Sequence, residues 1–162
     1  MTDTSVRPAD EIERIMEQYG DILYRLCVVA LKNESDAEDV VQDTILKLYQ
    51  KSPHFRDEEH RKAWLIRVAT NQCRDLLRFR IRHPQIDEEY LEKISVDSPD
   101  SGILEALADL PEKYRIVLML YYVEECSVKE IAGIICRTSS AVKMRLQKGR
   151  KLLEAKYREE YM

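Results

Sequence analysis

The sequence predicts an all-α protein made of two small helical domains, the second of which is a helix-turn-helix. Apolar residues recur three and four positions apart along most of the 162 residues, which is the period of an amphipathic helix. Only 4 Gly and 5 Pro are present to interrupt such helices. Between two dense helical patterns, residues 84–102 are rich in proline, serine and acidic side chains, which favours a flexible linker. We therefore expect domains at 10–83 and 103–162.

The first predicted helix covers residues 10–32, with an apolar stripe along one side. Gly20 lies inside it, so a break or kink there is an open alternative. The second predicted helix covers residues 35–50. Ser35 is its expected N-cap and Glu38 stands at the capping-box spacing. Its acidic side, opposite the apolar stripe, matches an ordinary surface helix when taken alone.

A long basic helix is predicted over residues 61–82, after a polar loop at 53–60. Trp64 and its apolar neighbours favour a packing side, and Asp75 is the single acidic residue. A packing side with a basic side opposite it suits binding to a nucleic-acid backbone, and a solvated basic surface is the alternative. The polar residues of that second side are Arg67, Asn71, Arg74, Arg78 and Arg82.

The C-terminal part predicts four helices, beginning near residues 103, 111, 128 and 139. Ser127 and Glu130 repeat the capping-box spacing. The tight turn at 136–138 has Cys136 where glycine is common. The turn must therefore either do without a positive φ or strain a non-glycine residue. A short helix, a three-residue turn and a longer basic helix make a helix-turn-helix, with a plain helical hairpin as the alternative.

The last helix has a buried and an outward side. The outward residues near its start can reach base edges in a major groove, whereas the basic residues farther along suit phosphate contacts. We predict base contacts from Ser140, Lys143, Met144 and Gln147, and positioning on phosphates by Arg145 and Lys148.

Charge is unevenly distributed along the chain. Residues 60–83 carry a net charge of +6 and residues 137–158 one of +7, while residues 84–102 carry −5, although the whole chain carries −4. Two basic segments on either side of an acidic one predict two contacts with a polyanion.

Several function classes find no support in the sequence. No apolar run is long enough to span a membrane, and no secretory signal is present, so we expect no membrane insertion and a cytoplasmic protein. The four cysteines form no CxxC and are not grouped with the histidines, so we predict buried thiols and neither metal nor other cofactor. No catalytic motif appears, which argues against an enzyme.

Three stretches read together resemble a known family. They are DAEDVVQDTILKLYQ, AWLIRVATNQCRDLLR and LPEKYRIVLMLYYVEECSVKEIAGIICRTSSAVKMRLQKGRKLL. From about residue 12 to residue 155 the chain is similar to bacterial RNA polymerase sigma factors of the extracytoplasmic-function (ECF) type, within the sigma-70 family. Cys136, Ser139, Ser140 and Ala141 depart from the glycine-containing sequence usual at the family's turn, so the resemblance leaves the promoter sequence open.

The resemblance implies an alternative sigma factor that binds core RNA polymerase, recognises promoter DNA, melts it and starts transcription. The helix at 35–50 matches the polymerase-docking region, with Asp39, Gln42 and Asp43 as candidates and Asp36 and Lys47 beside them. The segment from Phe55 to Arg82 matches the minus-ten region. Its candidate residues for opening DNA and capturing flipped bases are His60, Arg61, Asn71, Arg74 and Arg78.

By the same resemblance, the C-terminal domain reads the minus-thirty-five element, and an anti-sigma factor is an expected partner. Two other functions stay open from the residues alone. A stand-alone regulator would bind duplex DNA tightly through the helix-turn-helix without polymerase. A helical adaptor or inhibitor would bind polymerase without using DNA contacts.

Overall fold

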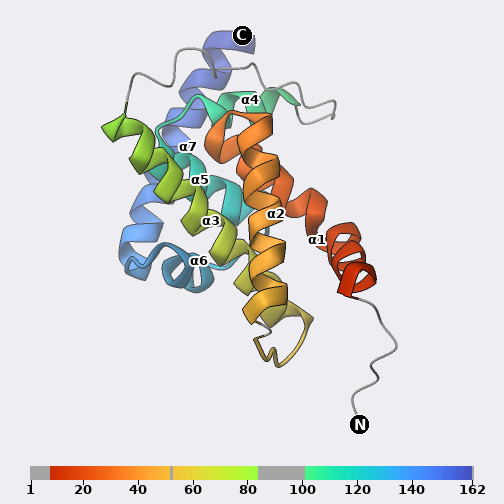
Figure 1. Cartoon of the computed structure of the whole chain (residues 1–162). Helices are drawn as coiled ribbons and strands as arrows, with labels where there is room; N and C mark the ends of the chain where they lie inside the picture. Colours follow the sequence, from red (N-terminus) through yellow and green to blue (C-terminus); the bar gives the residue numbers. More distant parts are fainter. Residues whose placement is uncertain (1–7, 52, 84–100, 162) are drawn as a thin grey trace.

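The computed structural model describes residues 8–51, 53–83 and 101–161, and these residues form helices and no β-strand (Figure 1). We call residues 8–83 the N-terminal unit and residues 101–161 the C-terminal unit. Their elements, in order, are α1 (Pro8–Leu31), α2 (Glu34–Lys51), α3 (Glu58–Arg82), α4 (Ser101–Ala108), α5 (Glu112–Leu118), the π-helical turn η2 (Met119–Val123), α6 (Val128–Ile135) and α7 (Ser139–Tyr161). The predicted all-α class is confirmed. Of the predicted linker, residues 84–100 lie outside the described part of the chain.

The N-terminal unit has the three predicted helices, and all three begin earlier than expected, at Pro8, Glu34 and Glu58. The N-cap of α2 is Asn33 and not Ser35, because the Asn33 side-chain oxygen accepts a hydrogen bond from the Asp36 amide at 2.9 Å. In α3 the Asp57 side chain accepts from the His60 amide, so the helix begins at Glu58 and not at residue 61. The first helix, α1, runs through Gly20 without a break.

The C-terminal unit follows the predicted order with one departure. Pro111 is the N-cap of α5 and not its first helical residue. The helix then widens into the π-turn η2, which the sequence pattern did not predict, and stops at Glu124. The capping box between Ser127 and Glu130 is confirmed, and it starts α6.

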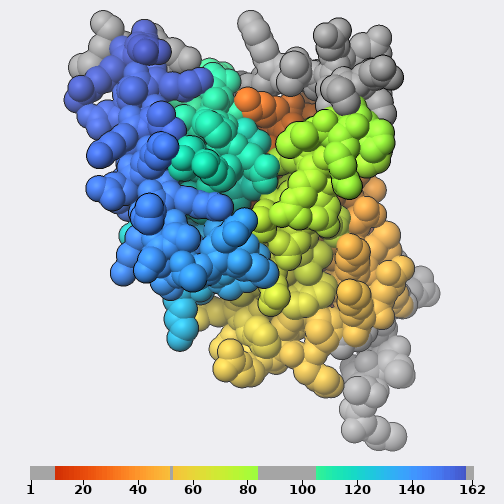
Figure 2. Space-filling view, turned by 90° about the vertical axis from the view of Figure 1, so that its left-hand side faces the viewer, coloured from red at the N-terminus to blue at the C-terminus, as the bar shows by residue number. Residues whose placement is uncertain are grey.

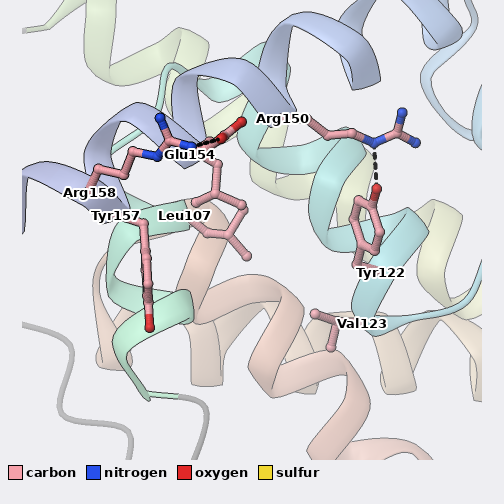
Figure 3. A pocket seen from close by; sticks show the side chains of 8 residues that line it. Leu107, Tyr122, Val123, Arg150, Glu154, Tyr157 and Arg158 are labelled. Atoms are coloured by element: carbon pink, nitrogen blue, oxygen red, sulfur yellow. Dashed lines mark hydrogen bonds and ion pairs between the residues drawn. The ribbon is translucent and has the colours of Figure 1, made fainter. Parts of the chain in front are cut away.

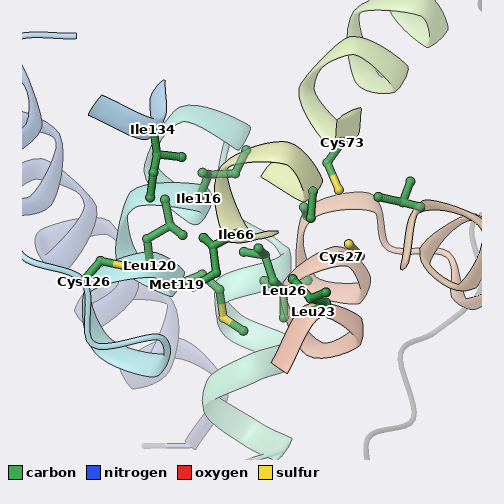
Figure 4. Packing of buried hydrophobic residues seen from close by; sticks show 14 of the residues in the cluster. Leu23, Leu26, Cys27, Ile66, Cys73, Ile116, Met119, Leu120, Cys126 and Ile134 are labelled. Atoms are coloured by element: carbon green, nitrogen blue, oxygen red, sulfur yellow. The ribbon is translucent and has the colours of Figure 1, made fainter. Parts of the chain in front are cut away.

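The two units pack against each other around one continuous apolar core (Figure 4). Leu26 of α1 and Ile66 of α3 lie beside Ile116 and Leu120 of the C-terminal unit, and each is at most 3% exposed. Full burial of one such side chain stabilises a fold by about 1.5–3 kcal/mol. The contact between the units therefore contributes substantially to the stability of the folded chain.

The cysteines fit the predicted role of small apolar residues at three of four positions. Cys27, Cys73 and Cys126 are buried, whereas Cys136 is exposed, so the prediction was wrong for Cys136. A hydrogen bond with Cys27, together with burial, raises the pKa of the Cys73 thiol well above its usual range. Burial also raises the pKa of Cys126 to about 11. Thiols in this state are poor nucleophiles.

Two helical glycines are expected to respond in opposite directions to substitution by alanine. At Gly149, a Cβ atom would lie 3.0 Å from Leu118 Cδ1 and 3.3 Å from Tyr114 Cβ, and both neighbours are buried. At Gly133, no atom lies within 4 Å of that position. Urea titration should show Gly149→Ala destabilised by about 1–2 kcal/mol through overpacking, and Gly133→Ala stabilised by up to about 1 kcal/mol. Equal shifts in both variants would contradict this packing of α5 on α7.

Candidate functional site

The outward side of α2 presents an acidic stripe. Asp39, Gln42 and Asp43 are exposed, and they stand at the spacing that places residues on one side of a helix. Leu46 continues the stripe and is 45% exposed. An exposed leucine beside two carboxylates is typical of a protein-binding surface, in which an apolar contact is flanked by charges. Sequence reasoning missed Leu46, although its i+3 spacing from Asp43 could have found it.

The two flanking candidates on α2 differ in their surroundings. Asp36 forms an ion pair with Arg80, so its carboxylate fastens the start of α2 to the end of α3. Lys47 is partly exposed. The structure therefore separates Asp36 from the exposed stripe formed by Asp39, Gln42, Asp43 and Leu46, which we call the α2 face.

The start of α3 gathers aromatic and basic side chains around Phe55. The His60 ring lies 5.3 Å from the Phe55 ring, and the Trp64 ring lies 5.9 Å from it on another side. The Arg61 guanidinium lies 5.6 Å from the same ring and 3.4 Å from a Glu58 carboxylate oxygen. Trp64 is partly buried against the core, which supports its predicted packing role.

Farther along α3, the predicted DNA-binding residues meet the C-terminal unit. Arg74 Nη1 donates to the Ile135 carbonyl oxygen at 3.2 Å, and Arg74 Nε lies 4.0 Å from a Glu112 carboxylate oxygen. Asn71 is partly buried, whereas Arg78 is exposed and lies 3.8 Å from Asp75. Figure 2 shows α6 directly beside α3. The candidates on α3 are thus divided between an exposed and a covered group.

The helix-turn-helix is formed by α6, its turn and α7. Cys136 adopts a φ of 56°, so the turn uses the left-handed conformation at a non-glycine residue and does not avoid it. Thr138 caps α7, because its hydroxyl oxygen accepts a hydrogen bond from the Ala141 amide at 3.1 Å. Val142 and Leu146 of α7 are buried, so α6 braces the first turns of α7 from the inside.

The outward side of α7 presents all four predicted base-reading residues. Ser140, Lys143 and Gln147 are exposed, and Met144 is 70% exposed. Polar side chains next to one apolar side chain match the donor, acceptor and methyl pattern of a major groove. The structure therefore brings the four predicted residues onto one accessible surface.

The two predicted phosphate-contacting residues of α7 differ in their exposure, since Lys148 is exposed and Arg145 is not fully so. The Lys148 ammonium lies 5.7 Å from the centre of the Tyr114 ring. Arg145 is partly buried, and burial lowers its pKa, with the nearby Arg137 and Arg74 acting in the same direction. Arg74 of α3 and Arg137 after α6 thus both act electrostatically on Arg145 of α7.

A buried acidic residue lies at the junction of the two units. Glu124 is 4% exposed, and its Oε1 atom has no hydrogen-bond partner. Burial raises the pKa of Glu124 to about 7, and Lys62 and Arg25 of the N-terminal unit act against this shift. Folding therefore favours the protonated carboxyl group.

Glu124→Gln is expected to flatten part of the pH dependence of stability. An unfolded glutamate ionises near pH 4.3, whereas folded Glu124 keeps its proton to about pH 7. Between these values the unfolded state binds fewer protons, so wild-type stability falls as pH rises. At pH 8 the variant should be more stable by up to about 3 kcal/mol, and near pH 4 the difference should vanish. Urea titrations between pH 4 and pH 8 measure the free energy of unfolding of wild type and variant, with exposed Glu125→Gln as the control. If the free energies of wild type and Glu124→Gln change in parallel with pH, the prediction is contradicted.

A hollow of about 600 Å³ lies between α4, η2 and α7 (Figure 3). Leu107, Val123 and Leu153 are among its lining residues. Its polar groups contact one another, since Arg150 Nε donates to the Tyr122 hydroxyl and Arg158 lies 2.7 Å from Glu154. The hollow is thus an apolar groove with paired charges along its rim.

Among residues 8–51, 53–83 and 101–161, no set of three or more His, Cys, Asp or Glu side chains is placed to hold a metal ion. None of the described helices combines the length and apolar character needed to cross a membrane.

Family comparison matches the two units separately. Residues 15–82 match the model of Sigma-70 region 2, and residues 101–153 match that of Sigma-70, region 4. The RNA polymerase sigma factor SigV of Bacillus subtilis is 31% identical over 134 residues, which cover 80% of this chain and 81% of SigV. The ECF RNA polymerase sigma factor SigW of Bacillus subtilis is 28% identical, covering 93% of this chain and 90% of SigW.

Solved structures share the fold. The sigma factor RpoE of Bartonella quintana, in complex with the anti-sigma factor NepR, superposes with a TM-score of 0.76 at 21% identity and covers 91% of this chain and 97% of RpoE. CnrH, in complex with the cytosolic domain of CnrY, gives a TM-score of 0.64 at 26% identity over 89% of this chain and 85% of CnrH.

Proposed function

Because this chain belongs to the sigma-70 family, as an RNA polymerase sigma factor of the ECF type, we propose that three of its surfaces divide the work of initiation. The chain binds core RNA polymerase and directs promoter recognition, DNA melting and the start of transcription. As in other sigma factors, its role is that of an initiation factor; we propose that it performs no catalysis of its own. We place its action in the cytoplasm, with RNA polymerase.

The first surface is the α2 face, which we assign to core polymerase. The observation that carries the proposal is the exposed stripe of Asp39, Gln42, Asp43 and Leu46, whose polar groups and leucine are not used in the fold. An ordinary DNA-binding protein has no need of an acidic stripe, since DNA is itself a polyanion. Lys47 lies beside the stripe, while Asp36 supports it through Arg80.

The second surface is α3 with the loop before it, which we assign to the minus-ten element. His60 and Arg61 lie around the Phe55 ring, where a flipped base would find an aromatic face and a cation together. Arg78 is exposed for backbone contact. Asn71 and Arg74 belong to the same side of α3, and Arg74 binds the Ile135 carbonyl oxygen of α6 in this arrangement.

The third surface is the outward side of α7, which we assign to the minus-thirty-five element. Ser140, Lys143, Met144 and Gln147 would meet base edges. Arg145 and Lys148 would hold the helix on phosphates after leaving their present neighbours, Arg137 and Tyr114. We also propose an anti-sigma partner, by analogy with RpoE of Bartonella quintana.

A gel-shift assay with promoter DNA separates this function from the two alternatives. The free chain should bind promoter DNA weakly, because each surface contributes only part of the site, and addition of core polymerase should give a tight, specific complex. Tight binding by the free chain would favour a stand-alone regulator. A polymerase complex whose promoter affinity is unaffected by this chain would favour an adaptor.

A further inference from the structure

Two residues of α1 hold a carboxylate at the start of α3. Tyr19 is 4% exposed, and its hydroxyl group donates a hydrogen bond to Glu58 Oε2. The side-chain amide of Gln18 donates to the same oxygen at 3.3 Å. Burial and the bond to Glu58 raise the pKa of Tyr19 to about 12, so the phenol keeps the proton that it donates. The position of the Glu58 side chain is therefore set by a helix that lies earlier in the sequence.

The second oxygen of the same carboxylate binds Arg61. Arg61 Nη1 lies 3.4 Å from Glu58 Oε1, three positions along α3. Arg61 Nε is buried without a hydrogen-bond partner, so among the described residues the Glu58 carboxylate is the acceptor that orients this guanidinium. The guanidinium carbon lies 5.6 Å from the centre of the Phe55 ring. The contacts thus run from Tyr19 through Glu58 and Arg61 to the aromatic ring assigned to base capture.

The other polar residue beside Phe55 is fixed without Glu58. His60 Nδ1 accepts a hydrogen bond from the Arg56 amide at 3.2 Å, and the His60 amide donates to Asp57 Oδ1 at 2.8 Å. Both contacts are made within the loop and the cap that precede α3. Loss of the Glu58 carboxylate should therefore release Arg61 and leave His60 in place.

Glu58 is an acid on a surface that otherwise suits DNA. Its side chain is 63% exposed, and an exposed ion pair contributes little to the free energy of unfolding. A carboxylate here repels phosphate groups, so electrostatics alone favours its removal. Glu59 also lies in the first turn of α3, where either acid interacts favourably with the helix dipole. What Glu58 adds is one oxygen for Tyr19 and another for Arg61.

We propose that Glu58, held by Tyr19, is a positioning residue that orients the Arg61 guanidinium beside the Phe55 ring for contact with a base captured at the minus-ten element. The inference deepens the proposed function and rests on it for the captured base. Without Glu58, Arg61 keeps its charge but samples more rotamers. A phosphate contact needs only the charge, whereas a base contact needs the planar guanidinium in one orientation.

Hydrogen exchange of the Arg61 Nε–H group, followed by NMR, measures this orientation in the free full-length chain. The exchange should be slow in the wild type, because Arg61 Nε is buried. Glu58→Gln and Tyr19→Phe should each speed it at least about fivefold, since each variant breaks one link of the chain of contacts. Glu59→Gln is the matched control, because it removes the same charge from the same turn and should leave the exchange rate unchanged.

Binding of single-stranded DNA separates base contact from phosphate contact. The probes are short homopolymers of deoxyadenosine, deoxycytidine and thymidine and an abasic strand of equal length, titrated into the free chain at low salt. Trp64 is the single tryptophan, and its ring lies 5.9 Å from the Phe55 ring, so its fluorescence reports binding at this cluster. The wild type should bind at least one homopolymer about tenfold more tightly than the abasic strand. We call this ratio the base advantage.

Glu58→Gln should lower the base advantage about fivefold, although it removes an acid and should bind the abasic strand slightly more tightly. Glu59→Gln should show the same slight gain on the abasic strand and keep the base advantage. Arg61→Ala should lose the base advantage, and adding Glu58→Gln to Arg61→Ala should lower it no further. Such non-additivity is expected only if Glu58 acts through Arg61.

Three results would overturn the positioning role. They are an unchanged Arg61 exchange rate in Glu58→Gln and Tyr19→Phe, a wild-type chain without a base advantage, and a base advantage that Glu58→Gln keeps or increases. An increase would make Glu58 a competitor of DNA for Arg61. Failure of the proposed function gives a different result, namely no promoter complex that depends on core polymerase. The exchange rates and the base advantage, measured on the free chain, would then still decide the role of Glu58.

Discussion

Replacing both Asp39 and Asp43 with lysine is expected to abolish assembly of the chain with core RNA polymerase, with affinity lowered at least about 100-fold. Both carboxylates lie on the α2 face, and reversal of their charge opposes a complementary surface instead of attracting it. Their side chains are exposed, so the free energy of unfolding should change by less than about 0.5 kcal/mol. Pull-down with core polymerase measures the first effect and urea titration the second.

A matched control is available on α1. Glu17→Lys with Asp21→Lys makes the same change of charge at the same i, i+4 spacing on exposed positions. This control should bind polymerase normally. Normal polymerase binding by the Asp39 and Asp43 variant would contradict the assignment of the α2 face to core polymerase. Equal loss of binding in both variants would show that net charge, and not the α2 face, is responsible. Leu46→Ala, tested beside them, should weaken binding without changing charge.

Loss of the base-reading side chains of α7 is expected to have the second largest effect. Lys143→Ala with Gln147→Ala should reduce output from a promoter that depends on its minus-thirty-five element by about 10- to 100-fold, since each good base contact contributes about 1–3 kcal/mol. Holoenzyme assembly should be unchanged, because the α2 face is untouched. Run-off transcription with saturating sigma factor measures this effect.

The sequence dependence of the loss separates base reading from phosphate contact. Gln147→Ala should relax discrimination among promoters altered at one position, whereas exposed Lys151→Ala should weaken all of them equally and reduce the salt dependence by about one charge. Full promoter output from a variant with Lys143, Gln147 and Lys148 all replaced by alanine would favour the adaptor interpretation.

Local sequence patterns predicted the helices well because capping and helical spacing depend only on residues a few positions apart. The Ser127 and Glu130 capping box is present as expected, and of the two alternatives open for the turn, Cys136 adopts the one with a positive φ. Helix starts were less predictable, since two acceptable caps stood close together at Asn33 and Ser35. Asn33 caps α2 because the chain turns at Lys32, whose φ of 56° no sequence pattern indicated.

The candidate site was predictable where side chains face solvent and unpredictable where they meet another element. Asp39, Gln42 and Asp43 are exposed as expected from the periodicity of α2 alone. The ion pair of Asp36 with Arg80 joins residues 44 positions apart, and the bond of Arg74 to Ile135 spans 61 positions. Helical spacing carries no information about such contacts.

The packing of the two units on each other could not be predicted either, because it depends on contacts between residues that are far apart in the sequence. The acidic linker predicted two domains and gave no indication of how they contact each other. In the structure, Arg115 Nη2 donates to the Ala30 carbonyl oxygen, and the described units share an apolar core. Arg115 itself lies within a helix that looked like ordinary core, and only the position of Ala30 in space gives it a partner.

Run-off transcription from a library of genomic promoters, with purified core polymerase and this chain, measures whether the chain directs promoter-specific initiation. Specific transcripts are expected from a defined subset of promoters. They should be absent without the chain and lost with the Asp39 and Asp43 lysine variant, but present with the Glu17 and Asp21 control. Transcripts that are the same with and without the chain, or that survive reversal of both α2 carboxylates, would contradict it.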